Sequence, residues 1–308
     1  MTRFVTHPYA ILAVVALFWG GNAIAGKLAV GHVSPMLLTL LRWAFACLIM
    51  TPLAFRDVHR EWPTIRRHLP FLFLLGAVGF TLFNAIFYLA VTYTSAINAT
   101  IEQSAMPLVV FAANYLLFRT GVTIFQLLGF SLTLIGVLVT AAHGDLATLL
   151  TLDLNRGDAM IIVAVLIYGG YTVALRFKPD INWRSTIYVL SLAALVTSIP
   201  LALAEWAMGH AQAPDVQGLS AALYTAIFPG LVAQILYIRG VTMIGPNRAN
   251  LFINLVPIFG AMLAVGIVGE ELHSYHLAAL AFVLAGISLA ELGAPRDGRP
   301  ADREPAPR

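Results

Sequence analysis

The chain has 308 residues, of which 59% are hydrophobic and only 11% are charged, and its mean hydropathy is +0.84. A soluble domain carries about 25% charged residues, so this composition excludes a water-soluble fold and indicates an integral membrane protein. The net charge of +3 arises from basic residues dispersed over separate loops, which excludes a nucleic-acid-binding patch. The single cysteine, Cys47, excludes a disulfide within one chain.

Apolar runs close to 20 residues long match the thickness of a bilayer core of about 30 Å. They predict an all-α membrane protein with ten transmembrane helices, at about 8–29, 35–55, 70–92, 95–117, 123–142, 157–177, 185–208, 217–240, 246–268 and 273–292. We expect the first run to be a retained helix, because it continues without a cleavage-like region. The alternation that marks a β-barrel strand is absent from the sequence.

Basic residues predict the orientation of these spans. If the N-terminus is cytoplasmic, only Lys27 and Arg156 fall on the outer side and Arg42 lies within a span, while the rest of the 18 lysines and arginines fall on the inner side. This asymmetry favours an inner-membrane protein with both termini in the cytoplasm. The Pro- and Arg-rich segment 293–308 has no apolar periodicity, so we expect a disordered cytoplasmic tail.

The two halves of the chain repeat each other. A shift of about 150 positions places residues 95–141 on residues 245–291, with Pro107 on Pro257 and Gly136 on Gly286. Five spans in each copy would force the copies to insert in opposite senses, which is the inverted repeat of many secondary transporters. The predicted units are a first repeat at 1–142, a periplasmic linker at 143–156, a second repeat at 157–292 and the tail.

Several stretches carry a family resemblance. They are FWGGNAIAGKLA, SPMLLTLLRWAFA and LLGFSLTLIGVLV in the first half, with YGGYTVAL and NLVPIFGAMLAVGIVGEE in the second. The chain resembles the EamA family of the drug/metabolite transporter superfamily over about residues 8–292. The resemblance implies an exporter-like carrier of the bacterial inner membrane, with spans 1, 3, 4, 6, 8 and 9 around a central cavity. Within the family, the YddG-type aromatic amino acid exporters are the nearest model.

One feature departs from the family pattern. The acidic residues at the turn after span 9, Glu270 and Glu271, correspond to Thr120 after span 4. A mechanism that needs matched acids in both halves is therefore in doubt.

Arg42 and Glu102 are the charged candidates at membrane depth. Each lies about seven residues from the outer end of its span, or roughly 10 Å deep. A charge at such depth costs at least about 2.5–3.5 kcal/mol, so it normally has a partner and a role. Equal depth predicts a buried charge pair of Arg42 with Glu102. Three interpretations stay open: Arg42 binds a substrate carboxylate, Glu102 takes a proton, or the pair is a structural lock between spans 2 and 4.

Neutral polar and aromatic side chains within the spans are candidates for the cavity wall. The amides are Asn22, Asn84, Asn98, Gln234, Asn250 and Asn254, and the aromatic residues are Trp19, Tyr88, Tyr168, Tyr171 and Tyr237. Such groups can hold a zwitterion or a ring without the cost of another buried charge. The alternative is that they serve as interhelical hydrogen bonds and core packing.

Matched prolines and glycines are candidate hinges or gates. Proline removes a backbone donor in mid-helix, and glycine pairs permit bending or close packing. The residues concerned are Pro107, Pro257, Gly20, Gly21, Gly169 and Gly170. Ordinary kinks are the alternative.

The sequence predicts no catalytic residue, cofactor or metal site, because it has no nucleotide-binding, hydrolase or metalloprotease motif. We expect a carrier that exports a small organic metabolite by alternating access. An aromatic or large apolar amino acid is the favoured substrate, because aromatic residues and amides share the cavity spans. Another amino acid, a nucleoside or a cationic drug are alternatives, while a channel or a membrane-embedded enzyme is disfavoured. The expected partners are a small-molecule substrate and the lipid bilayer, and no nucleic acid. Proton coupling and the choice between monomer and homodimer stay open.

Overall fold

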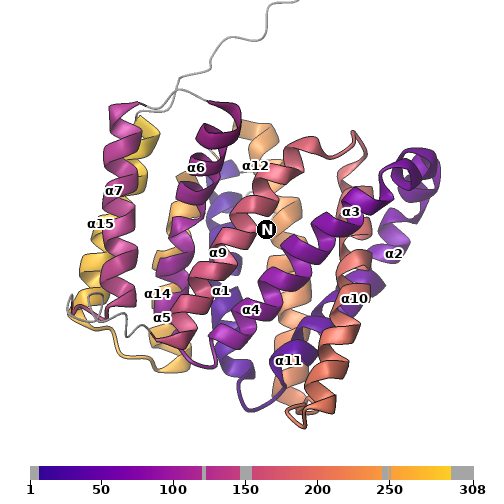
Figure 1. Cartoon of the computed structure of the whole chain (residues 1–308), viewed down its shortest axis with the longest axis horizontal. Helices are drawn as coiled ribbons and strands as arrows, with labels where there is room; N and C mark the ends of the chain where they lie inside the picture. Colours follow the sequence, from indigo (N-terminus) through magenta and orange to yellow (C-terminus); the bar gives the residue numbers. More distant parts are fainter. Residues whose placement is uncertain (1–6, 120–122, 146–154, 245–248, 250, 293–308) are drawn as a thin grey trace, which may run out of the picture.

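The described part of the chain is an all-helical bundle. The computed structural model describes residues 7–119, 123–145, 155–244, 249 and 251–292, and these contain helices, turns and loops but no strand (Figure 1). Thr120, Asn250 and the predicted tail at 293–308 lie outside the described residues. The expected all-α class is therefore confirmed for the part of the chain that can be described.

The helices follow the predicted spans closely. In the first half they are α1 (Pro8–Ala29), α2 (Pro35–Arg67), α3 (Leu69–Gly76), α4 (Phe83–Ala90), α5 (Ala96–Glu102), α6 (Met106–Phe118) and α7 (Ile124–Ala141). In the second half they are α9 (Arg156–Ala174), α10 (Trp183–Ala207), α11 (Val216–Thr225), α12 (Ala233–Ile244), α14 (Val256–Leu263) and α15 (Ser274–Leu292). Among the described residues, seven helical segments are long and apolar enough to cross a membrane, and Phe252–Val268 and Ser274–Ala290 are shorter apolar helices. The chain is thus a multi-pass membrane protein.

Helix α2 is longer than the sequence predicted. The apolar run ends near residue 55, but the helix continues to Arg67. Asp57 forms ion pairs with Arg60 at 2.9 Å and with Arg184 at 3.5 Å, and Glu61 accepts the amide of Asn182 at the start of α10 at 3.1 Å. Hydropathy marks only the apolar part of a helix. The charged extension after residue 55 is stabilised by the hydrogen bonds of the helix backbone and by the contacts of Asp57 and Glu61 with the start of α10.

Four helices are interrupted in matching places. The π-turn 77–82 separates α3 from α4, and a second π-helical segment, Ala226–Val232, separates α11 from α12. Short 3-10 segments, Gln103–Ala105 and Leu251–Leu255, precede α6 and α14. The members of each pair lie about 150 residues apart, as the sequence repeat does. Pro107, which has no N–H, cannot donate to the Gln103 carbonyl, so the turn before it tightens.

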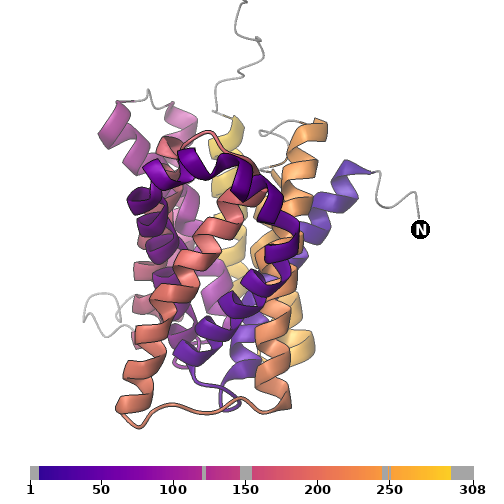
Figure 2. The same ribbon diagram turned by 90° about the vertical axis from the view of Figure 1, so that its right-hand side faces the viewer.

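The helices pack in recurring pairs. Helices α7 and α15 lie side by side at one edge of the bundle, and α2 and α10 lie at the opposite edge, which faces the viewer in Figure 2. Between these edges, α1 contacts α12 and α14, while α9 contacts α4 and α6. This arrangement places α1 and α9 between the two edges, with α1 the more buried of the two.

The candidate hinge glycines differ in their surroundings. A Cβ at Gly20 would lie 2.9 Å from the amide nitrogen of Gly260, and a Cβ at Gly169 would overlap Val109. Gly21 faces the Tyr224 hydroxyl, whereas Gly170 is exposed with no atom within 4 Å of a Cβ. Close helix approach therefore accounts for the first three glycines, and Gly170 does not make such a contact.

Carboxylates fix the helix starts at the end of the bundle where α5, α9 and α15 begin, which we call the α5 end. Glu270 accepts the first two amides of α5 at 2.7 and 3.0 Å, and Glu205 of α10 accepts two amides of α2 at 3.2 Å. Hydrogen bonds from the His32 ring, 2.6 Å away, and from the Gly218 amide lower the pKa of Asp215 below its usual value. The hydrogen bonds to ionised Asp215 therefore stabilise the fold at a pH above the ordinary carboxyl pKa. This stabilisation is lost as the pH falls through the lowered pKa of Asp215.

The crossing of α7 and α15 yields a test of the packing. In Gly129→Ala the new Cβ would overlap the Gly286 carbonyl oxygen. Because backbone atoms cannot move aside cheaply, we expect a loss of about 1–3 kcal/mol in stability and a lower Tm in thermal unfolding of the detergent-purified protein. The control is Gly170→Ala, which meets open space and should not lower the Tm. Equal Tm values for the two variants would contradict this packing.

Candidate functional site

The most distinctive buried group is the guanidinium of Arg42 on α2, whose residue is only 6% exposed. Its Nη1 donates to Asn22 Oδ1 of α1 at 2.7 Å and to the Tyr88 hydroxyl of α4. Tyr88 in turn donates to Asn22 Oδ1 at 3.0 Å. Two predicted cavity residues, Asn22 and Tyr88, are thus brought together around Arg42, which they tie to two neighbouring helices.

Arg42 lacks a counter-charge in this structure. Within the described residues no carboxylate lies within 4.0 Å of it, and its Nε is buried without a hydrogen-bond partner. Arginine stays protonated in proteins, so the positive charge cannot be removed by proton loss. An uncompensated buried charge is costly. Nε and Nη2 together form an edge with the fork geometry that matches a carboxylate.

The expected pair of Arg42 with Glu102 is not formed. Both carboxylate oxygens of Glu102 are buried without a hydrogen-bond partner, and the two side chains make no ion pair. Arg42 instead bonds toward α1 and α4, while Glu102 lies on α5, which packs against α1, α7, α9, α14 and α15. Equal depth along the membrane normal was therefore not enough to predict contact.

Aromatic rings form a continuous series beside Arg42. The guanidinium carbon lies 5.0 Å from the Trp43 ring centroid, and Phe80 stacks on Trp43 at 4.6 Å. The series continues through Tyr171, 5.8 Å from Phe80, to Tyr168, 5.3 Å further on. Trp43 Nε1 is buried without a partner. Sequence reasoning included Tyr168 and Tyr171 but missed Trp43, because span 2 was placed outside the cavity.

The remaining predicted cavity residues form no hydrogen bond with Arg42 among the described residues. Trp19 and Tyr237 contact each other at 5.3 Å between α1 and α12. Asn84 Nδ2 donates to the Phe80 carbonyl at 2.7 Å, and Asn84 Oδ1 is buried without a partner. Gln234 and Asn254 are half-buried.

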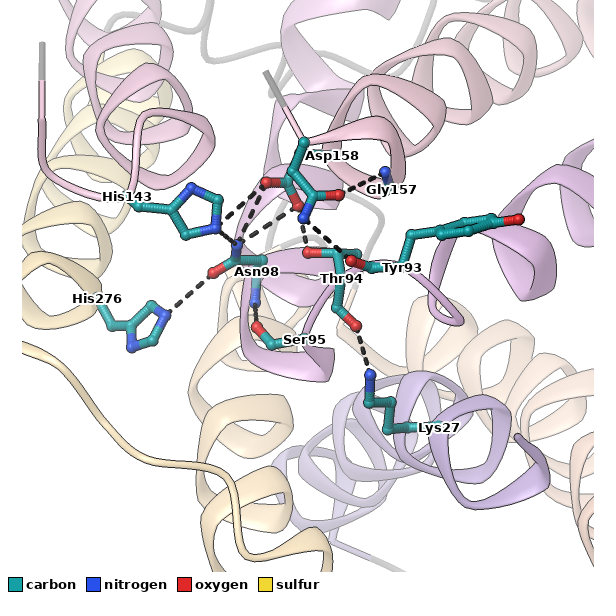
Figure 3. A network of polar contacts seen from close by, with 10 residues as sticks. Lys27, Tyr93, Thr94, Ser95, Asn98, His143, Gly157, Asp158 and His276 are labelled. Carbon is teal, nitrogen blue, oxygen red and sulfur yellow. Dashed lines mark hydrogen bonds and ion pairs between the residues drawn. The ribbon is translucent and has the colours of Figure 1, made fainter. Parts of the chain in front are cut away.

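A second polar centre lies at the α5 end (Figure 3). Asp158 of α9 is fully buried and accepts from the Thr94 hydroxyl and from Asn98 Nδ2, the latter at 3.4–3.5 Å. His143 Nε2 is 3.6 Å from Asp158 Oδ2, and His276 Nε2 is 3.0 Å from Asn98 Oδ1. The network joins α5, α9, α15 and the turn after α7. Asn98 therefore belongs here and not to the Arg42 centre.

This network borders a cavity of about 290 Å³. Residues that line it include Lys27, Tyr93, Asn98, His143, Glu271 and His276. Lys27 Nζ donates to the carbonyls of Val91 and Thr94 at 3.1 and 2.6 Å, so it satisfies the end of α4. The network thus has access to a polar cavity, unlike Glu102, which is fully buried.

Little in the sequence points to Asp158, His143 and His276 as members of one network. An acidic residue in the first turn of a helix is typical of a dipole-stabilising position, and histidines at span ends are common. Only the three-dimensional meeting of these ends reveals the network. Among the described residues, no group of three or more His, Cys, Asp or Glu side chains could hold a metal ion.

Comparison with known proteins places these features in context. Residues 7–142 and 155–292 match the model of the EamA-like transporter family. The uncharacterized transporter YyaM of Bacillus subtilis (strain 168) is 25% identical over 291 residues, which cover 92% of this chain and 92% of the relative. An uncharacterized transporter of Archaeoglobus fulgidus is 25% identical over 287 residues, covering 92% and 97%. A solved crystal structure with a TM-score of 0.63 and 18% identity covers 92% of this chain and 97% of its own, and it shows likeness of fold alone.

Stability measurements can separate a structural from a functional role of Arg42. Replacing a buried charge by an apolar side chain of similar volume is often neutral or stabilising, so Arg42→Met should unfold at or above the wild-type Tm. Asn22→Leu leaves the charge with one acceptor fewer and should cost about 1.5–3 kcal/mol. In the double variant most of this loss should disappear, since no buried charge is left to satisfy. A strongly destabilised Arg42→Met would instead identify Arg42 as a structural lock.

Proposed function

We propose, from the premise that this chain belongs to the EamA-like transporter family, that it is a secondary carrier which exports an aromatic or large apolar amino acid by alternating access. Its membership makes it a membrane transporter. The direction, the substrate and the coupling are our proposal. Export and the aromatic preference agree with the resemblance to YddG-type exporters.

The observation that carries the substrate proposal is the uncompensated charge of Arg42. Nε has no hydrogen-bond partner, so a substrate carboxylate at the Nε and Nη2 edge would supply the counter-charge that the described residues do not. Bidentate pairing of guanidinium and carboxylate gives orientation as well as binding free energy. A buried, unpaired cation strongly disfavours an apolar or cationic occupant, so it favours an anionic or zwitterionic one.

Two further features suit the rest of an amino acid. Asn84 lies one turn before Tyr88, hence on the same face of α4, and its free Oδ1 could accept from a substrate ammonium group. The ring series from Trp43 to Tyr168 offers apolar surface and edge-to-face contacts for a side chain. Together these groups provide one site for each part of a zwitterion with an aromatic side chain.

The helix interruptions support a rocking mechanism. We propose two inverted five-helix repeats, residues 1–142 and 157–292, joined by a periplasmic linker and with both termini cytoplasmic in the inner membrane. Contacts of α1 with α12 and α14 correspond to contacts of α9 with α4 and α6. The tightened turns before Pro107 and Pro257 are the proposed hinges, since a mid-helix 3-10 segment often marks one.

A cationic drug is a weaker candidate for the substrate. Such a carrier needs an acidic group that the drug can reach, and the acid at depth, Glu102, is fully buried. The positive charge of Arg42 would also repel a cation.

Transport by purified protein in proteoliposomes tests the proposal. Wild type should move labelled phenylalanine and tryptophan, and phenylalaninamide, which lacks the carboxylate, should compete poorly. Breaking a buried charge pair costs about 3–5 kcal/mol, so Arg42→Met should weaken phenylalanine binding by roughly 100-fold or more. Arg42→Lys keeps the charge but loses the fork and should rescue only partly.

The matched control is Arg60→Gln, because Arg60 has a side chain that is 68% exposed and only surface ion pairs. This variant should bind and transport like wild type. Equal competition by phenylalanine and its amide would rule out carboxylate recognition. Movement of threonine or a cationic drug in place of aromatic amino acids would overturn the substrate class.

A further inference from the structure

Glu102 is an unusual acid even for a buried one. It is 0% exposed, and neither carboxylate oxygen has a hydrogen-bond partner among the described residues. An ionised carboxylate in such a place would pay the full cost of desolvation, which the protein avoids by neutralising the group. In this conformation Glu102 is therefore a protonated acid that can give up its proton only when its surroundings change.

Asp158 is equally buried but has the opposite environment. It receives hydrogen bonds from Thr94 and Asn98 and lies 3.6 Å from His143, so its negative charge is supported. Asn98 and Glu102 are four residues apart on α5 and share one face. The two carboxyl groups are close enough to repel each other electrostatically when both are ionised. Such a pair holds one proton more readily than none.

Two histidines lie between the Glu102–Asp158 pair and the cavity. His276 orients Asn98, and His143 lies beside Asp158. His276 Nδ1 accepts the His273 amide at 3.0 Å, so its Nε2–H donates to Asn98 Oδ1. This hydrogen bond turns Asn98 Nδ2 toward Asp158 and His143 (Figure 3). The side chain of His143 is 43% exposed and lines the cavity. Its Nε2 accepts from Asn98 when neutral and can donate to Asp158 when protonated.

We propose that Glu102 and Asp158 share one exchangeable proton, which enters from the cavity at the α5 end through His143 and serves as the coupling proton of the carrier. When the pair is ionised, a hydronium ion in the cavity gives its proton to His143 Nε2 and leaves as water. His143 passes the proton to Asp158, and Asp158 passes it to Glu102, so each relay group returns to its starting state and one proton is gained by the pair. The use of this proton for transport rests on the proposed function, but the proton site itself does not.

The backbone next to Glu102 links the site to movement. The α-helix of α5 ends at Glu102, and the 3-10 segment Gln103–Ala105 follows directly, before Pro107. A change in charge at Glu102 therefore acts on the proposed hinge of this span. Several elements that pack against α5 bring titratable groups to it: Lys27 of α1, His143 after α7, Asp158 of α9, Glu270 before α15 and His276 of α15. Helix α14, which also packs against α5, has no titratable residue.

Infrared difference spectroscopy of the full chain in lipid tests the proton site without any substrate, with D₂O as the probe. Wild type should show a carboxylic-acid C=O band at neutral pH that shifts in D₂O and is missing in Glu102→Gln. Loss of a positioned proton-transfer group typically costs at least about 100-fold, so His143→Gln should slow the exchange roughly by that factor. Asp158→Asn should also slow it, while the Glu102 band persists.

The control is Glu271→Gln, an exposed carboxylate at the same cavity, which should change neither the band nor its exchange. Absence of a band that depends on Glu102, or exchange that is unaffected by His143→Gln, would overturn the proposal. In proteoliposomes, uptake of labelled phenylalanine should respond to a pH gradient in wild type and no longer do so in Glu102→Gln. A gradient response that survives in Glu102→Gln would refute the coupling role. A wild type that moves no amino acid at all would refute the proposed function and leave the infrared result standing.

Discussion

The buried charge of Arg42 is the constraint around which the interior is arranged. A guanidinium inside an apolar bundle must be held by neutral acceptors, and Asn22 and Tyr88 provide them from two other helices. Those bonds bring α1, α2 and α4 together on one side of the interior. They use only one nitrogen of the three, so the group is positioned without being neutralised. This combination of fixed geometry and remaining charge is what a binding site for an anion requires.

The chain separates a symmetric backbone from an asymmetric set of charges. The π-helical and 3-10 segments recur at the same spacing in both halves. Arg42, Glu102 and Asp158, in contrast, have uncharged residues at the corresponding positions: Leu190, Phe252 and Tyr9. The repeat is therefore visible in the helix interruptions, whereas each of these three buried charged residues occurs in one copy only.

Much of the fold could be predicted from the sequence, since apolar runs report directly on burial in lipid. The end of α2 was missed because the helix continues after its apolar part has finished. Arg42 was identified as special by its depth, but its partners were not, because depth does not specify the direction in which a side chain points. Asn98 was grouped with the cavity amides, yet it lies in the network of Asp158. That network is assembled from helix ends that are distant in sequence, and no local pattern marks them.

The π-turn 77–82 has a consequence for the phase of the helix that follows it. A π-turn accommodates about one more residue than an α-turn, and one residue of α-helix corresponds to a rotation of about 100°. Conversion of this wide turn to a regular one, at constant length, would therefore turn α4 about its axis relative to α3. Tyr88 would swing away from Arg42, and Asn84, one turn earlier on the same face of α4, would turn with it. The rotation of α4 about its axis therefore decides whether the hydrogen bond between Arg42 and Tyr88 can form. A rotation of α4 by the angle of one residue would be enough to form or break this part of the Arg42 site.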